Sequence, residues 1–266
     1  MKPIGNPFSQ ATSLLLSLTI NLNLSTTAYA NELADTLHRI KPGIVGIGTF
    51  HATRSPSALL IGSGFIVGDG FHVLTNAHVI PDAIDYSRNE SLAVFVRNFG
   101  KVEHRSAKKI AVDDQHDLAI LKMTGQALTP LKLGDSSKVR EGELYAFTGF
   151  PIGIVLGLYP VTHRGIISAI SPIVIPAYSS RQLNADMVRR LQAAYSVFQL
   201  DATAYPGNSG SPLYDTQSGQ VVGILNKVFV QKSKENLLSE PSGISYAIPI
   251  QYAKELLKAH DIHPSQ

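Results

Sequence analysis

The stretch Pro206-Gly207-Asn208-Ser209-Gly210-Ser211-Pro212 is the most informative part of the sequence. Glycines on both sides of Ser209 allow a tight turn with backbone dihedral angles that other residues rarely adopt. Such a turn can expose a serine hydroxyl and point neighbouring N–H groups in one direction. We therefore predict that Ser209 is a nucleophile and that the N–H groups of Gly207 and Ser209 stabilise a developing oxyanion. The alternative is a Gly-Ser turn between strands that carries no chemistry.

A serine nucleophile needs a general base and a group that orients this base. His78 directly follows an apolar run, and Asp117 directly precedes another one. Each residue alone would more often be structural, as a histidine beside a strand or an acid in a turn. Their chain order with Ser209 is that of chymotrypsin-type enzymes, and it differs from the orders in subtilisins and α/β-hydrolases. The order predicts a catalytic triad in a cleft between two lobes, with Ser209 alone on the second lobe.

After Gly43 the sequence consists of short apolar or alternating runs, many of them separated by Gly, Asp, Asn or Pro. This texture is typical of strands and turns. The first set of predicted strands covers residues 44–50, 59–67, 72–75, 92–96, 109–112 and 118–122. The second set covers residues 144–149, 159–163, 165–170, 197–200, 221–230 and 244–250. Two sets of strands joined by a more polar segment predict two β lobes.

Three other segments place apolar residues at helical spacing, and they predict helices over 31–40, 184–195 and 250–260.

Residues 1–30 differ in composition from the rest of the sequence. They combine an apolar tract, interrupted by Ser, Thr and Asn, with Ala28-Tyr29-Ala30, a pattern typical of a signal-peptidase site. The tract is short for a membrane helix. We therefore predict a cleaved signal peptide over residues 1–30, export to the periplasm or the medium, and no stable membrane span in the mature protein.

The composition excludes several classes of function. The sequence has 266 residues, 44% of them hydrophobic, and a net charge of only +3, which does not suggest a nucleic-acid partner. It has no cysteine, which excludes disulfides, thiol catalysis and cysteine-based zinc sites. None of the nine histidines has the His-Glu-x-x-His spacing of a metallopeptidase. We expect neither a metal nor a cofactor.

The sequence resembles trypsin-like peptidases of the bacterial HtrA (Deg protease) type. The resemblance rests on residues 62–67 (GSGFIV), 74–79 (LTNAHV), 117–122 (DLAILK), 164–168 (RGIIS), 201–202 with 206–212 (DA and PGNSGSP), and 243–250 (GISYAIPI). It implies an all-β, chymotrypsin-like fold of two perpendicular six-stranded antiparallel barrels with a short N-terminal and a C-terminal helix. The expected boundaries are a first barrel over 43–124, a linker over 125–142, a second barrel over 143–250 and a terminal helix over 250–260.

The resemblance also implies a function. Ser209 would attack the peptide bond, His78 would shuttle the proton, and Asp117 would hold the imidazole tautomer. The expected substrates are polypeptides, including unfolded proteins, in envelope quality control or processing, and the expected oligomer is a homotrimer. An alternative is a catalytically silent homologue that acts as a chaperone or a peptide-binding module. An α/β-hydrolase esterase fits less well, because Ser211 occupies the last position of its Gly-x-Ser-x-Gly motif.

The sequence departs from the HtrA pattern in three places. The few residues after the predicted terminal helix leave no room for the usual PDZ domain, so we expect a protease domain alone. Ser211 replaces a glycine and gives a motif that also resembles glutamyl endopeptidases. These carry a histidine near the positions of Leu225 and Asn226, so we do not expect glutamate specificity. The segment 171–197 is longer than its HtrA counterpart and could gate access, bind a partner or decorate the surface.

The pocket for the residue before the cut is expected to be formed by Thr203, Ala204, Tyr205, Ile224, Leu225 and Asn226. None of these is acidic, so we predict a preference for small or medium apolar side chains over Arg and Lys. Asn208 stands where pancreatic-type zymogens carry an acid that pairs with a freed amino terminus. Activation by such trimming is therefore not expected.

Overall fold

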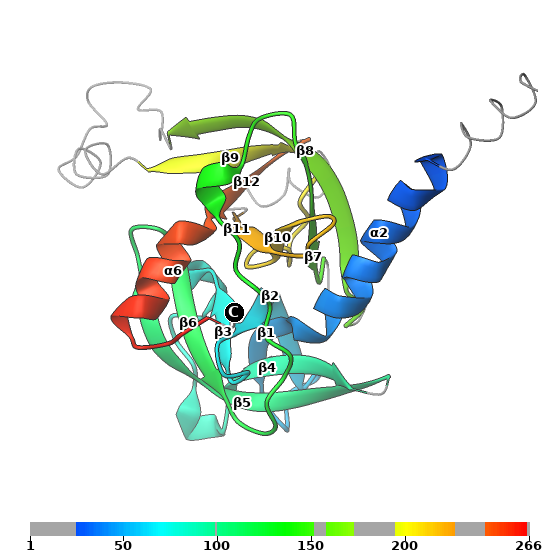
Figure 1. Ribbon diagram of the computed structural model, residues 1–266. Coiled ribbons are helices and arrows are strands. Elements are labelled where there is room, and N and C mark those ends of the chain that lie inside the picture. The colour runs from blue at the N-terminus through cyan, green and yellow to red at the C-terminus, as the bar shows by residue number, and fades with distance from the viewer. Residues whose placement is uncertain (1–24, 99, 152–157, 173–194, 227–242, 265–266) are drawn as a thin grey trace, which may run out of the picture.

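The computed structural model describes residues 25–98, 100–151, 158–172, 195–226 and 243–264 of the chain. Two closed barrels of six antiparallel strands lie one above the other, and they are accompanied by one helix near each end of the chain (Figure 1). This arrangement confirms the predicted all-β, chymotrypsin-like fold with a short N-terminal helix and a C-terminal helix.

The first barrel contains β1 (Ile44–Phe50), β2 (Ala58–Val67), β3 (His72–Thr75), β4 (Ser91–Asn98), β5 (Lys101–Asp113) and β6 (Leu118–Met123). Its strand order is β1-β2-β3-β6-β5-β4, and the pairing of β4 with β1 closes it. The strands bury β-branched and aliphatic side chains in one interior cluster, which suits a pleated surface that is packed on one face. This cluster contains Val45, Ile47, Ile66, Val73, Val94 and Leu121.

The second barrel contains β7 (Leu144–Gly149), β8 (Val161–Pro172), β9 (Ser196–Asp201), β10 (Pro212–Asp215), β11 (Val221–Asn226) and β12 (Ile244–Pro249). The pairing of β10 with β7 closes it, with Leu213 opposite Phe147. Its interior cluster contains Phe147, Ile167, Phe198, Leu200, Leu213 and Leu225. The segment between the barrels runs beside β11, because Leu133 forms a parallel bridge with Val221.

Most predicted strands coincide with observed ones, and three differ. The prediction missed β10, and it recognised only the end of β5, whose first residues are mostly polar and exposed. Residues 159–163 and 165–170 were predicted as two strands, but β8 continues through Gly165. The glycine sits where the strand passes close to its neighbour, because a Cβ there would lie 2.6 Å from the carbonyl oxygen of Asp201.

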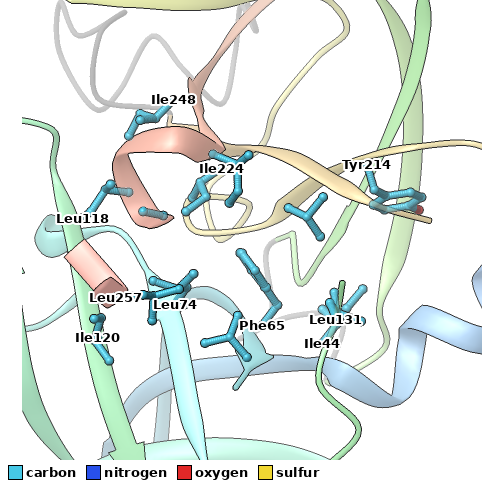
Figure 2. Close-up of a cluster of buried hydrophobic side chains, with 14 of the residues drawn as sticks. Ile44, Phe65, Leu74, Leu118, Ile120, Leu131, Tyr214, Ile224, Ile248 and Leu257 are labelled. Atoms are coloured by element: carbon cyan, nitrogen blue, oxygen red, sulfur yellow. The ribbon is translucent and has the colours of Figure 1, made fainter. Parts of the chain in front are cut away.

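A third buried cluster joins the two barrels. Phe65 and Leu74 come from the first barrel, and Ile224 and Ile248 come from the second. Figure 2 shows these side chains pointing toward one another, with Leu257 of the C-terminal helix beside Leu74. All five side chains are almost completely inaccessible to solvent. The interface is therefore an apolar core, and removing its surface from water stabilises the relative position of the barrels.

The two helices pack on the barrels. Helix α2 (Ser25–Ile40) ends before Pro42, and its buried Thr36 donates a hydrogen bond to the carbonyl of Gln217 after β10, at 2.9 Å. Helix α6 (Ile250–Ala259) packs against β11 and β12. Short 3-10 turns are η1 (Lys41–Gly43), η2 (Ala77–Val79), η3 (Tyr86–Arg88) and η4 (Ser136–Lys138). Neither helix in the described ranges is long and apolar enough to cross a membrane.

Two predictions concern residues near or beyond the described ranges. Helix α2 begins at Ser25, before the predicted start at Asn31, and so continues across the predicted cleavage site after Ala30. Most of the predicted signal peptide lies outside the described residues. The same is true of the predicted helix 184–195 and of most of the segment 171–197, which therefore remain predictions.

Candidate active site

The structure brings His78 and Asp117 into direct contact. The Nδ1 atom of His78 lies 2.6 Å from Oδ2 of Asp117, and the backbone N–H of His78 donates to Oδ1 at 2.9 Å. Both oxygens of one carboxylate thus hold the same residue. Because the carboxylate accepts a hydrogen bond from Nδ1–H, Nε2 is the ring nitrogen left to act as a base.

Asp117 has an unusual backbone conformation, with φ at +53°, a region that few residues other than glycine adopt. Two hydrogen bonds hold its carbonyl oxygen there, from the backbone N–H of Ala77 at 3.1 Å and from the side chain of Asn76 at 3.0 Å. The Asp117 turn and the turn η2 are therefore locked to each other by backbone and side-chain contacts. This rigidity orients the carboxylate toward His78.

A third residue reaches the carboxylate from the other barrel. The side-chain amide of Asn226, at the end of β11, donates to Oδ2 of Asp117 at 2.8 Å. Asn226 was predicted to line the substrate pocket, and the structure places its buried side chain against Asp117. The sequence carried no signal for this contact, because it depends on how the two barrels are packed.

Ser209 lies in a buried turn between β9 and β10, and 6% of its surface is accessible. Gly210 has φ at +85°, and its N–H donates to the carbonyl of Leu225, the neighbour of Asn226, at 2.9 Å. The turn is thus attached to the same strand end that reaches Asp117. Its glycine is required because L side chains rarely adopt this conformation.

The backbone of β2 lies between the His78 and Ser209 turns. A Cβ built at Gly62 would be 2.7 Å from the side chain of Val79 and 3.1 Å from the carbonyl oxygen of Ser209. All three residues of the predicted triad are therefore gathered at one place between the barrels. In the described part of the chain, Ser209 and His78 form no direct hydrogen bond.

The backbone N–H groups of Gly207 and Ser209 differ from those of their neighbours in the turn. Within the described ranges, neither donates a hydrogen bond to the protein, whereas the N–H groups of Asn208, Gly210 and Ser211 all do. Two unused donors that flank one buried residue are the arrangement that the stabilisation of an oxyanion requires.

The predicted pocket residues fall into two groups. Thr203, Ala204 and Tyr205 are half-buried in the segment before the Ser209 turn. In contrast, Ile224 belongs to the core between the barrels, and Leu225 belongs to the interior cluster of the second barrel. Only the first group is therefore partly accessible to a ligand.

A second histidine–carboxylate pair stands beside the first, and sequence reasoning missed it. His116 Nδ1 lies 2.6 Å from Oδ2 of Asp113, and its ring stacks on Tyr252 of α6 at 4.1 Å. Tyr195 contacts the same ring edge-on at 4.7 Å. Burial, followed by the charges of Asp117 and Asp113, raises the pKa of the Tyr195 hydroxyl, which stays protonated. This cluster anchors the Asp117 turn to the C-terminal helix.

Comparison with known proteins identifies the family to which the chain belongs. Residues 62–224, more than half of the chain, match the family of the trypsin-like peptidase domain, and the chain belongs to this family. The matched region contains His78, Asp117 and Ser209.

The most informative relatives are bacterial. A probable periplasmic serine endoprotease DegP-like of Pseudomonas putida (strain W619) is 35% identical over 201 residues, which are 75% of this chain and 34% of that protein. The protein of the same name from Pseudomonas savastanoi pv. phaseolicola is 31% identical over 260 residues, which are 93% of this chain and 47% of that protein. The chain thus spans about a third to a half of the length of these relatives.

Solved structures agree with this class. The HtrA-type protease AlgW with a tripeptide superimposes with a TM-score of 0.62 at 28% identity, covering 85% of this chain and 62% of that one. The same protease with a decapeptide covers 87% of this chain and 68% of that one, with a TM-score of 0.62 at 25% identity. The predicted resemblance to trypsin-like peptidases of the HtrA type is confirmed.

Proposed function

We propose that the protein is an exported serine endopeptidase that hydrolyses peptide bonds through His78, Asp117 and Ser209. One observation carries the proposal. The Asp117 carboxylate accepts hydrogen bonds from His78 on the first barrel and from Asn226 on the second, beside the buried turn that presents Ser209. A carboxylate that orients a histidine, beside a serine in a tight turn flanked by glycines, is the geometry expected of a catalytic triad. The names of the relatives favour the periplasm as its compartment.

The proposed chemistry follows the usual two steps of acyl transfer. Nε2 of His78 takes the proton of the Ser209 hydroxyl while its oxygen attacks the carbonyl carbon of the peptide bond. Asp117 stabilises the imidazolium that forms. The N–H groups of Gly207 and Ser209 donate to the carbonyl oxygen as it becomes negative. His78 then protonates the leaving amine, and water hydrolyses the acyl-enzyme by the reverse sequence of proton transfers.

The proposed substrates are polypeptides, with unfolded proteins as the best candidates for envelope quality control. The related protease AlgW has been solved with a tripeptide and with a decapeptide, in agreement with a polypeptide ligand for this class. The accessible part of the predicted pocket, Thr203 to Tyr205, has no charged side chain. An apolar residue before the cut is therefore favoured over Arg, Lys or Glu.

The proposal is tested by incubating the purified protein with reduced and alkylated lactalbumin. We expect wild-type protein to produce peptides that end mainly in small or medium apolar residues. Ser209→Ala should produce none while keeping the same circular dichroism spectrum. Peptide profiles dominated by Arg, Lys or Glu would refute the proposed specificity. If wild-type protein binds the unfolded chain without cutting it, the peptide-binding alternative replaces the proposal.

A further inference from the structure

Ser63 of β2 touches the Ser209 turn at two points, although it belongs to the other barrel. Its backbone N–H donates to the carbonyl of Ser209 at 2.8 Å, and its hydroxyl donates to the carbonyl of Gly207 at 2.7 Å. Ser63 is completely buried, so no solvent competes for these bonds. One residue therefore holds the carbonyl groups on both sides of Asn208.

The direction of the Ser63 hydroxyl is determined by a third contact. The backbone N–H of Phe150 donates to Oγ of Ser63 at 2.9 Å. A serine hydroxyl has one proton to give, and the carbonyl of Gly207 only accepts. Since Phe150 occupies an acceptor site of Oγ, the single proton points to Gly207. The carbonyl of Ser63 is held in turn by the hydroxyl of Thr75 at 2.7 Å.

Two glycines allow the backbone to approach Ser63 this closely. A Cβ at Gly210 would lie 2.0 Å from the Ser63 carbonyl oxygen. A Cβ at Gly149 would lie 2.7 Å from Oγ of Ser63. Real Cβ atoms do not approach other heavy atoms to these distances, so larger residues would separate the turn from Ser63.

We infer that Ser63 is a positioning residue that holds the Gly207–Ser209 turn in the conformation that stabilises the oxyanion. The inference rests on the proposed function. Gly207 has φ at +98°, and a glycine alone does not resist rotation of its peptide groups. The two carbonyls that Ser63 holds belong to the peptide groups on either side of the Asn208–Ser209 peptide, so this peptide, which carries the Ser209 N–H, is restrained from both ends. The first barrel thus supports the oxyanion site in addition to supplying His78 and Asp117.

The test compares Ser63→Ala with Ser136→Ala. Ser136 is also buried and hydrogen-bonded, but its hydroxyl contacts Gln251 in α6, away from the Ser209 turn. With a chromogenic peptide substrate, we expect Ser63→Ala to lower kcat about 10- to 100-fold with little change in KM, since a misplaced donor weakens transition-state stabilisation. Ser136→Ala should keep the wild-type kcat.

A peptide aldehyde provides a readout that a merely structural role would not change. The aldehyde adds to Ser209 and places its oxygen in the oxyanion site, whereas the matching peptide alcohol has no carbonyl and only occupies the substrate cleft. Ser63→Ala should weaken aldehyde binding about as much as it lowers kcat and leave binding of the alcohol unchanged. The pH at half-maximal kcat/KM should also stay at its wild-type value, because the His78–Asp117 pair is untouched.

The outcomes separate this inference from the proposed function. If wild-type protein binds the aldehyde and cuts the substrate while Ser63→Ala does both equally well, the inference is wrong and the proposed function stands. If wild-type protein does neither, the proposed function fails first. Should Ser63→Ala not fold, Ser63→Cys keeps a weaker donor, and an unchanged kcat in that variant would also overturn the inference.

Discussion

Asp117 is hydrogen-bonded to residues of both barrels. Its carboxylate holds His78 through two hydrogen bonds, and its second oxygen also accepts from Asn226 across the barrel interface. A left-handed backbone at this position is unfavourable by itself, and the bonds from Ala77 and Asn76 to its carbonyl offset that cost. The chain therefore uses local strain to aim one carboxylate, and in the proposed active site small displacements would reduce the rate strongly.

The contact between Asn226 and Asp117 yields a first prediction. Replacing Asn226 by Leu removes a donor to a charged oxygen, a bond of about 1.5 to 3 kcal/mol. We expect kcat to fall about 10-fold or more with KM nearly constant, as measured with a chromogenic peptide. Asn226→Ser keeps a donor and should recover part of the loss. A kcat for Asn226→Leu equal to the wild-type value would show that Asp117 needs no support from the second barrel.

His163 in β8 yields a prediction about pH. Its Nε2 atom is buried and has no partner among the described residues, and its ring stacks on Phe147. Burial lowers the pKa of this imidazole below its usual value near 6.5. Below that pH the unfolded chain binds a proton that the folded protein does not, so the free energy of unfolding should decrease as pH falls through about 6.5.

The pH dependence is measured by urea unfolding at pH 8 and pH 5. His163→Leu should lose less stability than the wild type between these values, because it removes one group that is protonated mainly in the unfolded chain. His260→Gln, which changes an exposed histidine after α6, should keep the wild-type dependence. Equal losses in His163→Leu and the wild type would contradict the assignment.

The turn around Ser209 depends on the close approach of Gly210 to the backbone of Ser63 in β2, as well as on its own backbone conformation. Gly210 and Gly142 have the same φ of +85°, but nothing lies within 4 Å of a Cβ built at Gly142. Gly142→Ala therefore isolates the conformational cost, about 1 to 2 kcal/mol. Gly210→Ala adds the contact with the Ser63 carbonyl at 2.0 Å.

We expect Gly142→Ala to lower the free energy of unfolding by that amount and to keep its activity. Gly210→Ala should cost about 3 kcal/mol or more and should reduce kcat at least about 100-fold, because the turn must move away from Ser63. Urea unfolding and peptide hydrolysis measure the two effects. Similar stability and similar activity of the two variants would show that the close contact is unimportant.

Sequence patterns predicted most of the strands because apolar runs and turn residues alternate regularly in both lobes. Two strands were missed in whole or in part, and the reasons are physical. β10 has only four residues, Pro212–Asp215, and the first half of β5 exposes mostly polar side chains on both faces. His78, Asp117 and Ser209 could be predicted as a triad because each sits in a short local motif. The contacts of Asn226 and Ser63 could not be predicted from the sequence, because they depend on packing between residues far apart in the chain.

At the scale of the whole molecule, one apolar core makes the two barrels a single unit. Leu257 of α6 is completely buried in the cluster that contains Leu74 and Ile224. The same helix contacts His116, which directly precedes Asp117. The C-terminal helix is therefore connected both to the barrel interface and to the site.

Leu257→Ala should destabilise both barrels together. Truncation of a buried leucine costs about 2 to 5 kcal/mol, and we expect the urea midpoint to fall in one cooperative transition. Glu255→Ala, at an exposed position of the same helix, serves as the control and should unfold like the wild type. Two separate transitions in Leu257→Ala would show that the barrels fold independently.

We propose above all that Ser209 is a nucleophile activated by His78 and Asp117. The decisive experiment is reaction of the purified protein with a fluorophosphonate probe, followed by mass spectrometry of the labelled peptide. We expect a single adduct on Ser209, lost in Ser209→Ala and formed far more slowly in His78→Ala, because triad residues act as a unit. A folded wild-type protein that remains unlabelled, or that is labelled at another residue, would contradict this proposal.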